Sequence, residues 1–259
     1  MKMGFTFNGI SSQSMNINAR LTNWQASPSL RNSFVTIPGK PGIADFGSDI
    51  AEKIITVHCN VYPQYKFSKL VSVMDNLADW LNPERGVQQL VLDDVPDRYF
   101  IARLSEAVDC DRLILSAGAF DLKFVCPDPH AYALTDETYT ITAEGENTVT
   151  RLKGNADSEP VYLIKGIIPS GTNTYVSIQT NNEEIRVIGP LYDGETLIID
   201  TGKVTAKVVD TSGETLRNGL PLMQELNFPV LRKGNNTVTI TPVGADFMEL
   251  KIQAKSRWR

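Results

Sequence analysis

The chain has little of what secreted, membrane-spanning and nucleic-acid-binding proteins need. Its 259 residues include three cysteines and two histidines. So few cysteines, in an odd number, exclude a disulfide framework. No run of about 18 apolar residues occurs, which excludes a membrane-spanning helix. Met1–Asn8 has no apolar stretch long enough for a signal peptide. We therefore expect synthesis in the cytoplasm, and retention there until the chain is released.

Basic charge is also scarce. The chain carries 25 Lys and Arg against 30 Asp and Glu, a net charge of -5 with a pI near 5.2. A dedicated nucleic-acid binder needs a basic surface to neutralise phosphates, so this class is excluded. Hydrophobic residues make up 42% and the mean hydropathy is -0.16, which excludes global disorder. The length suits one large domain or two ordinary ones.

Catalytic and metal-binding motifs are absent. The sequence contains no G-x-S-x-G elbow, H-E-x-x-H, phosphate-binding G-x-x-x-x-G-K or dinucleotide-binding G-x-G-x-x-G. The adjacent residues His58 and Cys59 are expected on opposite faces of one strand, so they cannot easily share an ion. Cys126 and His130 have C-x3-H spacing, but we interpret the cysteines, Cys110 included, as small buried thiols. We therefore predict no catalytic residue, no metal site and no cofactor.

Three aspartates offer an alternative interpretation. Asp93, Asp94 and Asp97 could form a carboxylate group for acid–base chemistry or for a cation. They surround Pro96 at an expected hairpin tip, where aspartate is favoured by turn geometry alone. We therefore interpret them as turn residues.

The C-terminus combines basic residues with a tryptophan. We interpret it as a solvated terminus rather than a nucleic-acid-binding tail, because so few charges make no larger patch. Trp258 is expected to be covered by the body of the protein or by a neighbouring chain. The basic residues are Lys251, Lys255, Arg257 and Arg259.

The first half mixes strands with one helix. From Tyr65 to Leu81 the apolar period is about 3.6, which predicts a helix that ends before Pro83. Its stripe favours packing on a sheet, and a groove for a partner is the alternative. The stripe comprises Leu70, Met74, Leu77 and Leu81, with Phe67, Val73 and Trp80 beside them. Predicted strands are Phe5–Phe7, Lys53–Val61, Gln89–Leu92, Tyr99–Leu104 and Phe120–Val125, with an irregular segment at Arg20–Arg31 and a turn at Asp93–Asp97.

Beyond Tyr132 the pattern becomes entirely β. Short β-branched runs alternate with turn dipeptides such as Asp193-Gly194 and Ser212-Gly213, which predicts an antiparallel sandwich. Pro127 and Pro129 would stiffen the connection between the two parts. We therefore predict a mainly β chain with an α+β domain over residues 1–132 and a β-sandwich over residues 133–259.

Several short fragments, in their order and spacing, resemble the distal tail protein family of siphophages that infect Gram-positive hosts. In the first half they are Phe7-Asn8-Gly9, Ile37-Pro38-Gly39-Lys40-Pro41-Gly42, Ala78-Asp79-Trp80-Leu81, Asp97-Arg98-Tyr99 and Phe124-Val125-Cys126-Pro127-Asp128-Pro129. In the second half they are Gly154-Asn155, Glu159-Pro160, Gly194-Glu195, Ile199-Asp200, Phe228-Pro229-Val230-Leu231 and Gly234-Asn235-Asn236.

The resemblance implies a structural baseplate hub without enzymatic activity. Its N-terminal domain would be a β-sandwich or split-barrel-like fold with one helix that forms a ring, usually a hexamer. The ring would join the major tail tube protein to the tail-tip protein at the distal end of the virion tail, of a phage or a prophage. Genome DNA would pass through it only in transit. The C-terminal domain would be a galectin-like sandwich, to which a receptor-binding protein attaches in some relatives.

Two other classes of function remain open at this stage. The first is a carbohydrate-binding module that attaches the particle to cell-wall polysaccharide. The second, which ranks below it, is a hydrolase. Sugar recognition normally gathers aromatic rings beside polar groups, whereas Tyr139, Tyr162, Tyr175 and Tyr192 are scattered. An acidic chain also suits a DNA conduit, because a basic lumen would hold phosphates.

Overall fold

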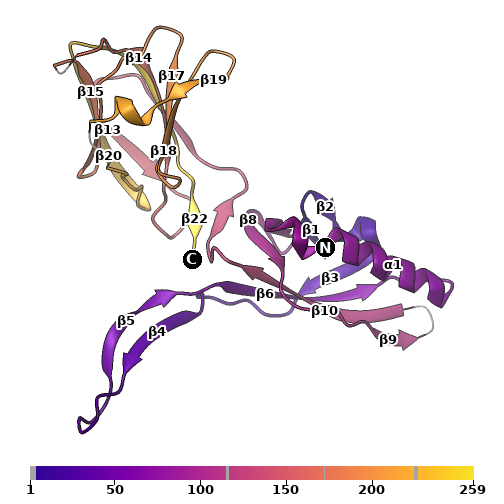
Figure 1. Cartoon of the computed structure of the whole chain (residues 1–259). Coiled ribbons are helices and arrows are strands. Elements are labelled where there is room, and N and C mark those ends of the chain that lie inside the picture. Colours follow the sequence, from indigo (N-terminus) through magenta and orange to yellow (C-terminus); the bar gives the residue numbers. More distant parts are fainter. Residues whose placement is uncertain (1–3, 115–116, 172, 225–226) are drawn as a thin grey trace. The chain divides into compact units, whose positions relative to one another are not determined.

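The computed structural model (Figure 1) describes residues 4–114, 117–171, 173–224 and 227–259. Met1–Met3 lie outside these residues. They begin the segment Met1–Asn8, for which the sequence predicts no signal peptide. The chain divides into two compact units, the first running to Leu134 with Arg259 and the second Thr135–Trp258. No helix in the described ranges has the length and apolarity to cross a membrane.

One antiparallel sheet forms the frame of the first unit (Figure 1). Its neighbouring strands follow the order β2, β1, β7, β8, β10, β6, β3, while β9 pairs with β10 and β11 pairs with β8. Along β6, Ile55, Val57 and Cys59 are buried and alternate with the more exposed His58 and Asn60. The bounds are β1 Phe5–Phe7, β2 Ile10–Ser11, β3 Ile17–Leu21, β6 Lys53–Val61, β7 Gln88–Leu92, β8 Val95–Leu104, β9 Asp111–Ile114, β10 Ala117–Cys126 and β11 Ala131–Ala133.

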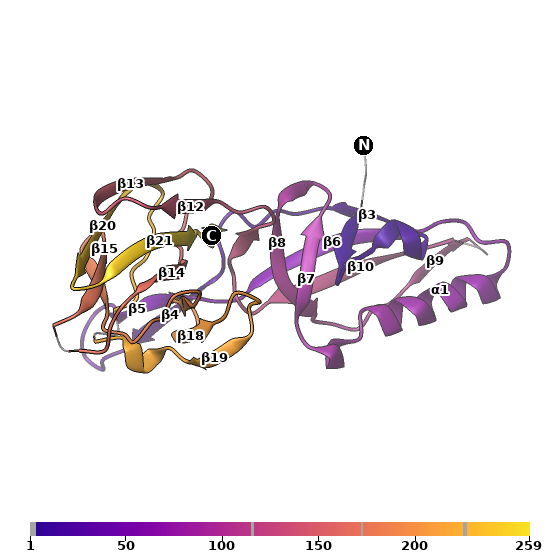
Figure 2. The ribbon, with the colours of Figure 1, turned by 90° about the horizontal axis from the view of Figure 1, so that it is seen from above.

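The helix α1 (Phe67–Trp80) runs along the strands of this sheet (Figures 1 and 2). The Trp80 ring stacks on Phe5 with 5.4 Å between the ring centroids. Its Nε1–H donates a hydrogen bond of 3.1 Å to the carbonyl oxygen of Phe7. An aromatic core therefore fixes the end of the helix against β1. The buried residues of α1 are Leu70, Val73, Leu77 and Trp80.

The predicted helix and its packing face are confirmed, except that Phe67 is exposed and Met74 is only partly buried. Phe67 is the first residue of α1 and is 46% exposed, because the buried stripe begins one turn later, at Leu70. Met74 is partly exposed, and Leu81 is buried just after the last helical residue. A 3-10 turn, Pro83–Arg85, follows the helix where proline was expected to end it.

Two antiparallel sheets make the second unit. One has the strand order β12, β21, β14, β17, β18, β19, and the other β13, β20, β15, β16. A single apolar core contains residues of both sheets, and the Tyr162 hydroxyl lies 2.8 Å from Thr180 Oγ1, which joins β14 to β15. The prediction of a mainly β chain is therefore confirmed. The bounds are β12 Thr138–Ile141, β13 Gly145–Arg151, β14 Val161–Ile167, β15 Tyr175–Thr180, β16 Glu183–Val187, β17 Thr196–Asp200, β18 Thr205–Val209, β19 Thr215–Asn218, β20 Gly234–Val243, β21 Asp246–Gln253 and β22 Arg257–Trp258, with a 3-10 turn at Leu220–Leu222.

Two sequence predictions in the first unit are wrong. The segment Arg20–Arg31, predicted as irregular, contains the end of β3 and the first two residues of β4 (Leu30–Val35). The alternation of Ile17 and Ala19 with polar residues in β3 was short enough to miss. The predicted turn Asp93–Asp97 is confined to Asp93 and Asp94, because Val95 already pairs with Leu92. β5 (Ala44–Ile50), β9, β13 and β19 were not predicted either.

Candidate functional site

The candidate ligands His58 and Cys59 lie on opposite faces of β6. His58 Nδ1 is 2.7 Å from Asp121 Oδ1 on β10. Cys59 is buried, and burial raises the pKa of its thiol to about 12. Within the residues that the structure describes, no group of three or more His, Cys, Asp or Glu side chains could hold a metal ion.

His130 takes part in a hydrogen-bond cluster after β10. Its Nδ1 lies 2.8 Å from Asp128 Oδ1, its backbone N–H donates to the same oxygen at 3.0 Å, and the Tyr132 hydroxyl donates to Asp128 Oδ2. Burial raises the pKa of the Asp128 carboxyl, but these hydrogen bonds outweigh it and lower the pKa to about 2. Cys126 is buried, which raises its thiol pKa to about 12. The cluster holds the turn after β10 by local hydrogen bonds.

Two of the three candidate aspartates bind separate structural partners. Asp94 Oδ2 accepts the Leu21 N–H at 3.3 Å, and the Asp97 carboxylate accepts two hydrogen bonds of 2.9 Å from the Arg98 guanidinium. Asp93 occupies the turn between β7 and β8. The structure therefore gives two of these side chains a role in the hairpin and its neighbours.

Arg257, near the C-terminus, is held by residues of the second unit. The Arg257 guanidinium donates to the Glu159 carboxylate at 3.0 and 3.1 Å, and Trp258 is partly buried in β22. Gly154 has φ 83°, and a Cβ there would collide with the Arg257 backbone. This close approach explains why glycine stands at 154.

The most exposed apolar element is a separate hairpin, here called the arm, of residues 30–50. It comprises β4 (Leu30–Val35), a tip loop and β5, which pair with each other as a two-stranded sheet (Figure 1). Every residue of β4 is exposed, and Phe46 of β5 is 70% exposed. An isolated hairpin is marginally stable, and clustered exposed apolar side chains mark interaction sites. The exposed apolar residues are Leu30, Phe34, Val35, Ile37, Ile43, Phe46 and Ile50.

The root of the arm is held by a buried cation. Lys53 Nζ lies 4.9 Å from the ring centroid of Trp24 and 5.7 Å from that of Phe100. Lys53 is 2% exposed, and burial lowers its pKa. The Ala51 N–H also donates to the Ser29 carbonyl oxygen at 2.8 Å. Cation–π and backbone contacts therefore fix where the arm leaves the unit.

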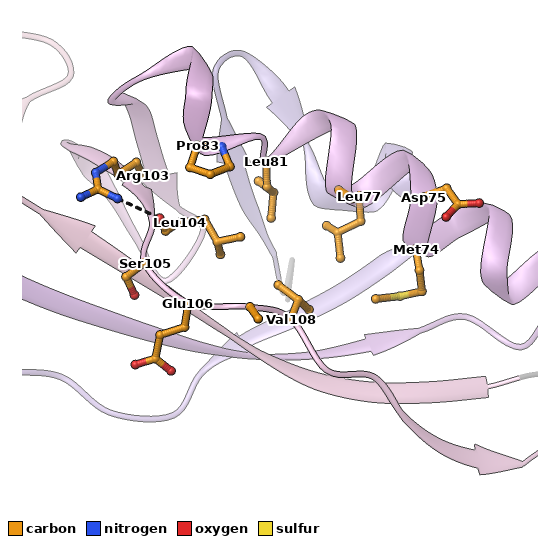
Figure 3. A pocket seen from close by; sticks show the side chains of 12 residues that line it. Met74, Asp75, Leu77, Leu81, Pro83, Arg103, Leu104, Ser105, Glu106 and Val108 are labelled. Atoms are coloured by element: carbon orange, nitrogen blue, oxygen red, sulfur yellow. Dashed lines mark hydrogen bonds between the residues drawn. The ribbon is translucent and has the colours of Figure 1, made fainter.

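The first unit also has an apolar groove of about 480 Å³ (Figure 3). In the figure, Met74, Leu77 and Leu81 point from the helix toward Val108 on the segment after β8. Asp75 and Arg103 lie on its border. The groove is here defined by Met74, Asp75, Leu77, Ala78, Leu81 and residues 103–108 with Pro83. Thus the helix that packs on the sheet also leaves an open apolar surface.

A second, more polar groove lies in the second unit. It measures about 370 Å³ and is lined by charged and hydroxyl side chains with one apolar residue, Met248. Its lining includes no aromatic ring, which sugar binding normally uses. Polar lining residues are Lys165, Asp193, Glu195, Thr196, Asp210 and Thr211.

The arm and the groove were not predicted as functional surfaces. Ile37 and Ile43 on either side of a Pro-Gly loop were visible in the sequence, but nothing local indicates that both are exposed. Exposure depends on which faces meet in the folded chain.

Comparison with known proteins gives two matches that carry weight. Residues 7–126 match the family model described as the phage tail protein RIFT-related domain. The structure is similar to the crystal structure of SPP1 Dit (gp 19.1), described as a paradigm of the hub adsorption apparatus in Gram-positive infecting phages. The TM-score is 0.75 at 14% identity, over 99% of this chain and 99% of that one.

Two phage p2 baseplate structures are similar to a lesser degree. The Sr form has a TM-score of 0.48 at 10% identity, over 98% of this chain and 99% of that chain. The Ca form has a TM-score of 0.44 at 11% identity, over 95% and 93% respectively. No curated protein sequence matches the chain. Residues 7–126 therefore match a phage tail protein domain, and the whole chain has the fold of the SPP1 Dit structure, in agreement with the resemblance drawn from the sequence.

Proposed function

We propose that the chain is the ring-forming baseplate hub at the distal end of a siphophage or prophage tail. The ring, a hexamer, joins the major tail tube protein to the tail-tip protein and lets genome DNA pass. The chain acts by assembly, without catalysis or a cofactor. We assign ring formation to residues 1–132 and an outward module, to which a receptor-binding protein can attach, to residues 133–259.

The observation that carries this proposal is the arm. Its exposed apolar side chains, such as Phe46 at 70%, would be costly to leave in water. In a closed ring each copy offers the same two surfaces to its neighbours, so every such element is covered. The likeness to the SPP1 hub protein supports the same reading.

The test is the solution mass of the full chain by light scattering after gel filtration, over a range of concentrations. Six copies of 28.6 kDa give about 172 kDa. A mass near this value supports the closed hexamer. A monomer at every concentration, also after addition of the tail-tip protein, would contradict ring formation.

The carbohydrate-binding alternative stays a prediction from the sequence. The polar groove of the second unit does not favour it, because no aromatic ring lines that groove. A glycan array probed with the full chain separates the two functions. The hub predicts no specific signal, whereas dose-dependent binding to a wall polysaccharide would favour the alternative.

A further inference from the structure

We propose that the arm of one copy docks in the groove of a second copy, with Lys40 of the arm tip against Asp75 of the groove. This inference rests on the proposed ring, and it names the two surfaces that would close it. Both surfaces belong to the first unit and are open in the single chain.

The first argument is chemical fit. The arm tip presents Ile37 and Ile43, which are 42% and 58% exposed, on either side of a Pro-Gly loop. The groove offers about 480 Å³ lined mainly by aliphatic side chains of α1 and of the segment after β8 (Figure 3). That volume is large enough for several aliphatic side chains, and their burial removes apolar surface from water on both copies.

The second argument is charge. Lys40 lies at the exposed tip between the two isoleucines, and Asp75 lies on the helix side of the groove. Within the described part of the chain, neither side chain forms an ion pair or a hydrogen bond. The groove lining also carries Arg103 and Glu106, and Glu106 pairs with Lys123, so the three lining charges sum to -1. Lys40 against Asp75 therefore adds charge complementarity to the apolar fit and favours one register of docking.

The third argument is reach. Eight residues from Leu30 to Ile37 span roughly 25 Å at about 3.3 Å per residue. The root is fixed at Trp24 and Lys53, so the arm starts from a defined point of the unit. A projecting element and a separate receiving groove on the same chain make a head-to-tail contact, and such contacts form a ring when the rotation between copies closes.

Cross-linking tests the contact directly. Two full-length variants are prepared in a C110S background, one with Ile43→Cys and one with Ala78→Cys, an exposed groove residue. A disulfide needs Cβ atoms about 3.5–4.5 Å apart, so mild oxidation links only neighbouring sites. We expect a linked dimer in the mixture, about tenfold above a control mixture in which Leu152→Cys, 71% exposed in the second unit, replaces Ala78→Cys.

Charge reversal tests the register. We expect K40E and D75K each to shift the concentration for half-assembly upward several-fold, because like charges then meet in every interface. The double variant K40E/D75K should restore assembly, which mere damage to either surface cannot do. Both substitutions are at exposed positions, and circular dichroism confirms that each of the three variants folds.

The outcomes separate this inference from the ring itself. A wild-type ring without the cross-link, or without rescue by the double variant, overturns arm-in-groove docking and leaves the ring intact. A monomeric wild type without the cross-link overturns both. A cross-link together with rescue supports the inference.

Discussion

At the scale of single residues, Asp128 shows how burial and hydrogen bonding compete. Burial raises the pKa of its carboxyl, whereas His130 and Tyr132 lower it, with a net value of about 2 against 3.8 in a free chain. A carboxyl with a depressed pKa in the folded state stabilises the fold above pH 3.8. This stabilisation is lost as the pH falls through about 2.

We expect Asp128→Asn to lower the free energy of unfolding by about 1 kcal/mol at pH 7, allowing for the 39% exposure of the side chain. The difference from wild type should shrink as the pH approaches 2. Urea titrations at a series of pH values measure it. Asp49→Asn is the control, since its pair with Arg31 is 3.6 Å long and exposed. An equal, pH-independent loss in both variants would contradict this account.

At the scale of elements, α1 has two surfaces with different roles. Leu70 is 3% exposed and packs inward, whereas Val71 on the same helix is 42% exposed. Removal of a buried leucine side chain leaves a cavity, which costs more than the lost transfer free energy alone.

We therefore expect Leu70→Ala to lower the free energy of unfolding by about 3 kcal/mol, and Val71→Ala to change it by less than about 0.5 kcal/mol. Chemical denaturation followed by tryptophan fluorescence measures both values in variants that lack Trp258, where Trp24 and Trp80 of the first unit remain; the Trp80 ring packs on Phe5. Similar losses of unfolding free energy in the two variants would mean that burial of the apolar stripe does not hold the helix on the sheet.

At the scale of the whole molecule, each unit has its own hydrophobic core. The core of the second unit includes Ile240, 1% exposed, between its two sheets. Units with separate cores unfold as separate cooperative transitions unless a large interface couples them. The proposed division into residues 1–132 and 133–259 therefore predicts two unfolding transitions.

Scanning calorimetry of the full chain should accordingly resolve two transitions. We expect Leu70→Ala to lower the midpoint of one by several degrees and Ile240→Ala to lower that of the other. A single transition that both variants shift equally would contradict two independent cores.

The local pattern of residues in the sequence was sufficient to predict much of the fold. The strand Lys53–Val61 was predicted with its observed bounds, because β-branched residues alternate there. The helix came within two residues of α1, because a 3.6-residue period and a following proline mark it. Strand β3 was missed because five residues with two polar positions carry too little signal.

What the sequence determined by itself is therefore the β-rich class, the single amphipathic helix and the lack of catalytic motifs. The tertiary structure decided where apolar surface stays open. Phe46 and Ile43 are as hydrophobic as core residues, yet they are exposed because β4 and β5 form a sheet of their own. The groove likewise forms only where α1 and the segment after β8 come together in the folded chain. The exposure of a side chain results from how the elements pack, and it cannot be read from the order of residues along the chain.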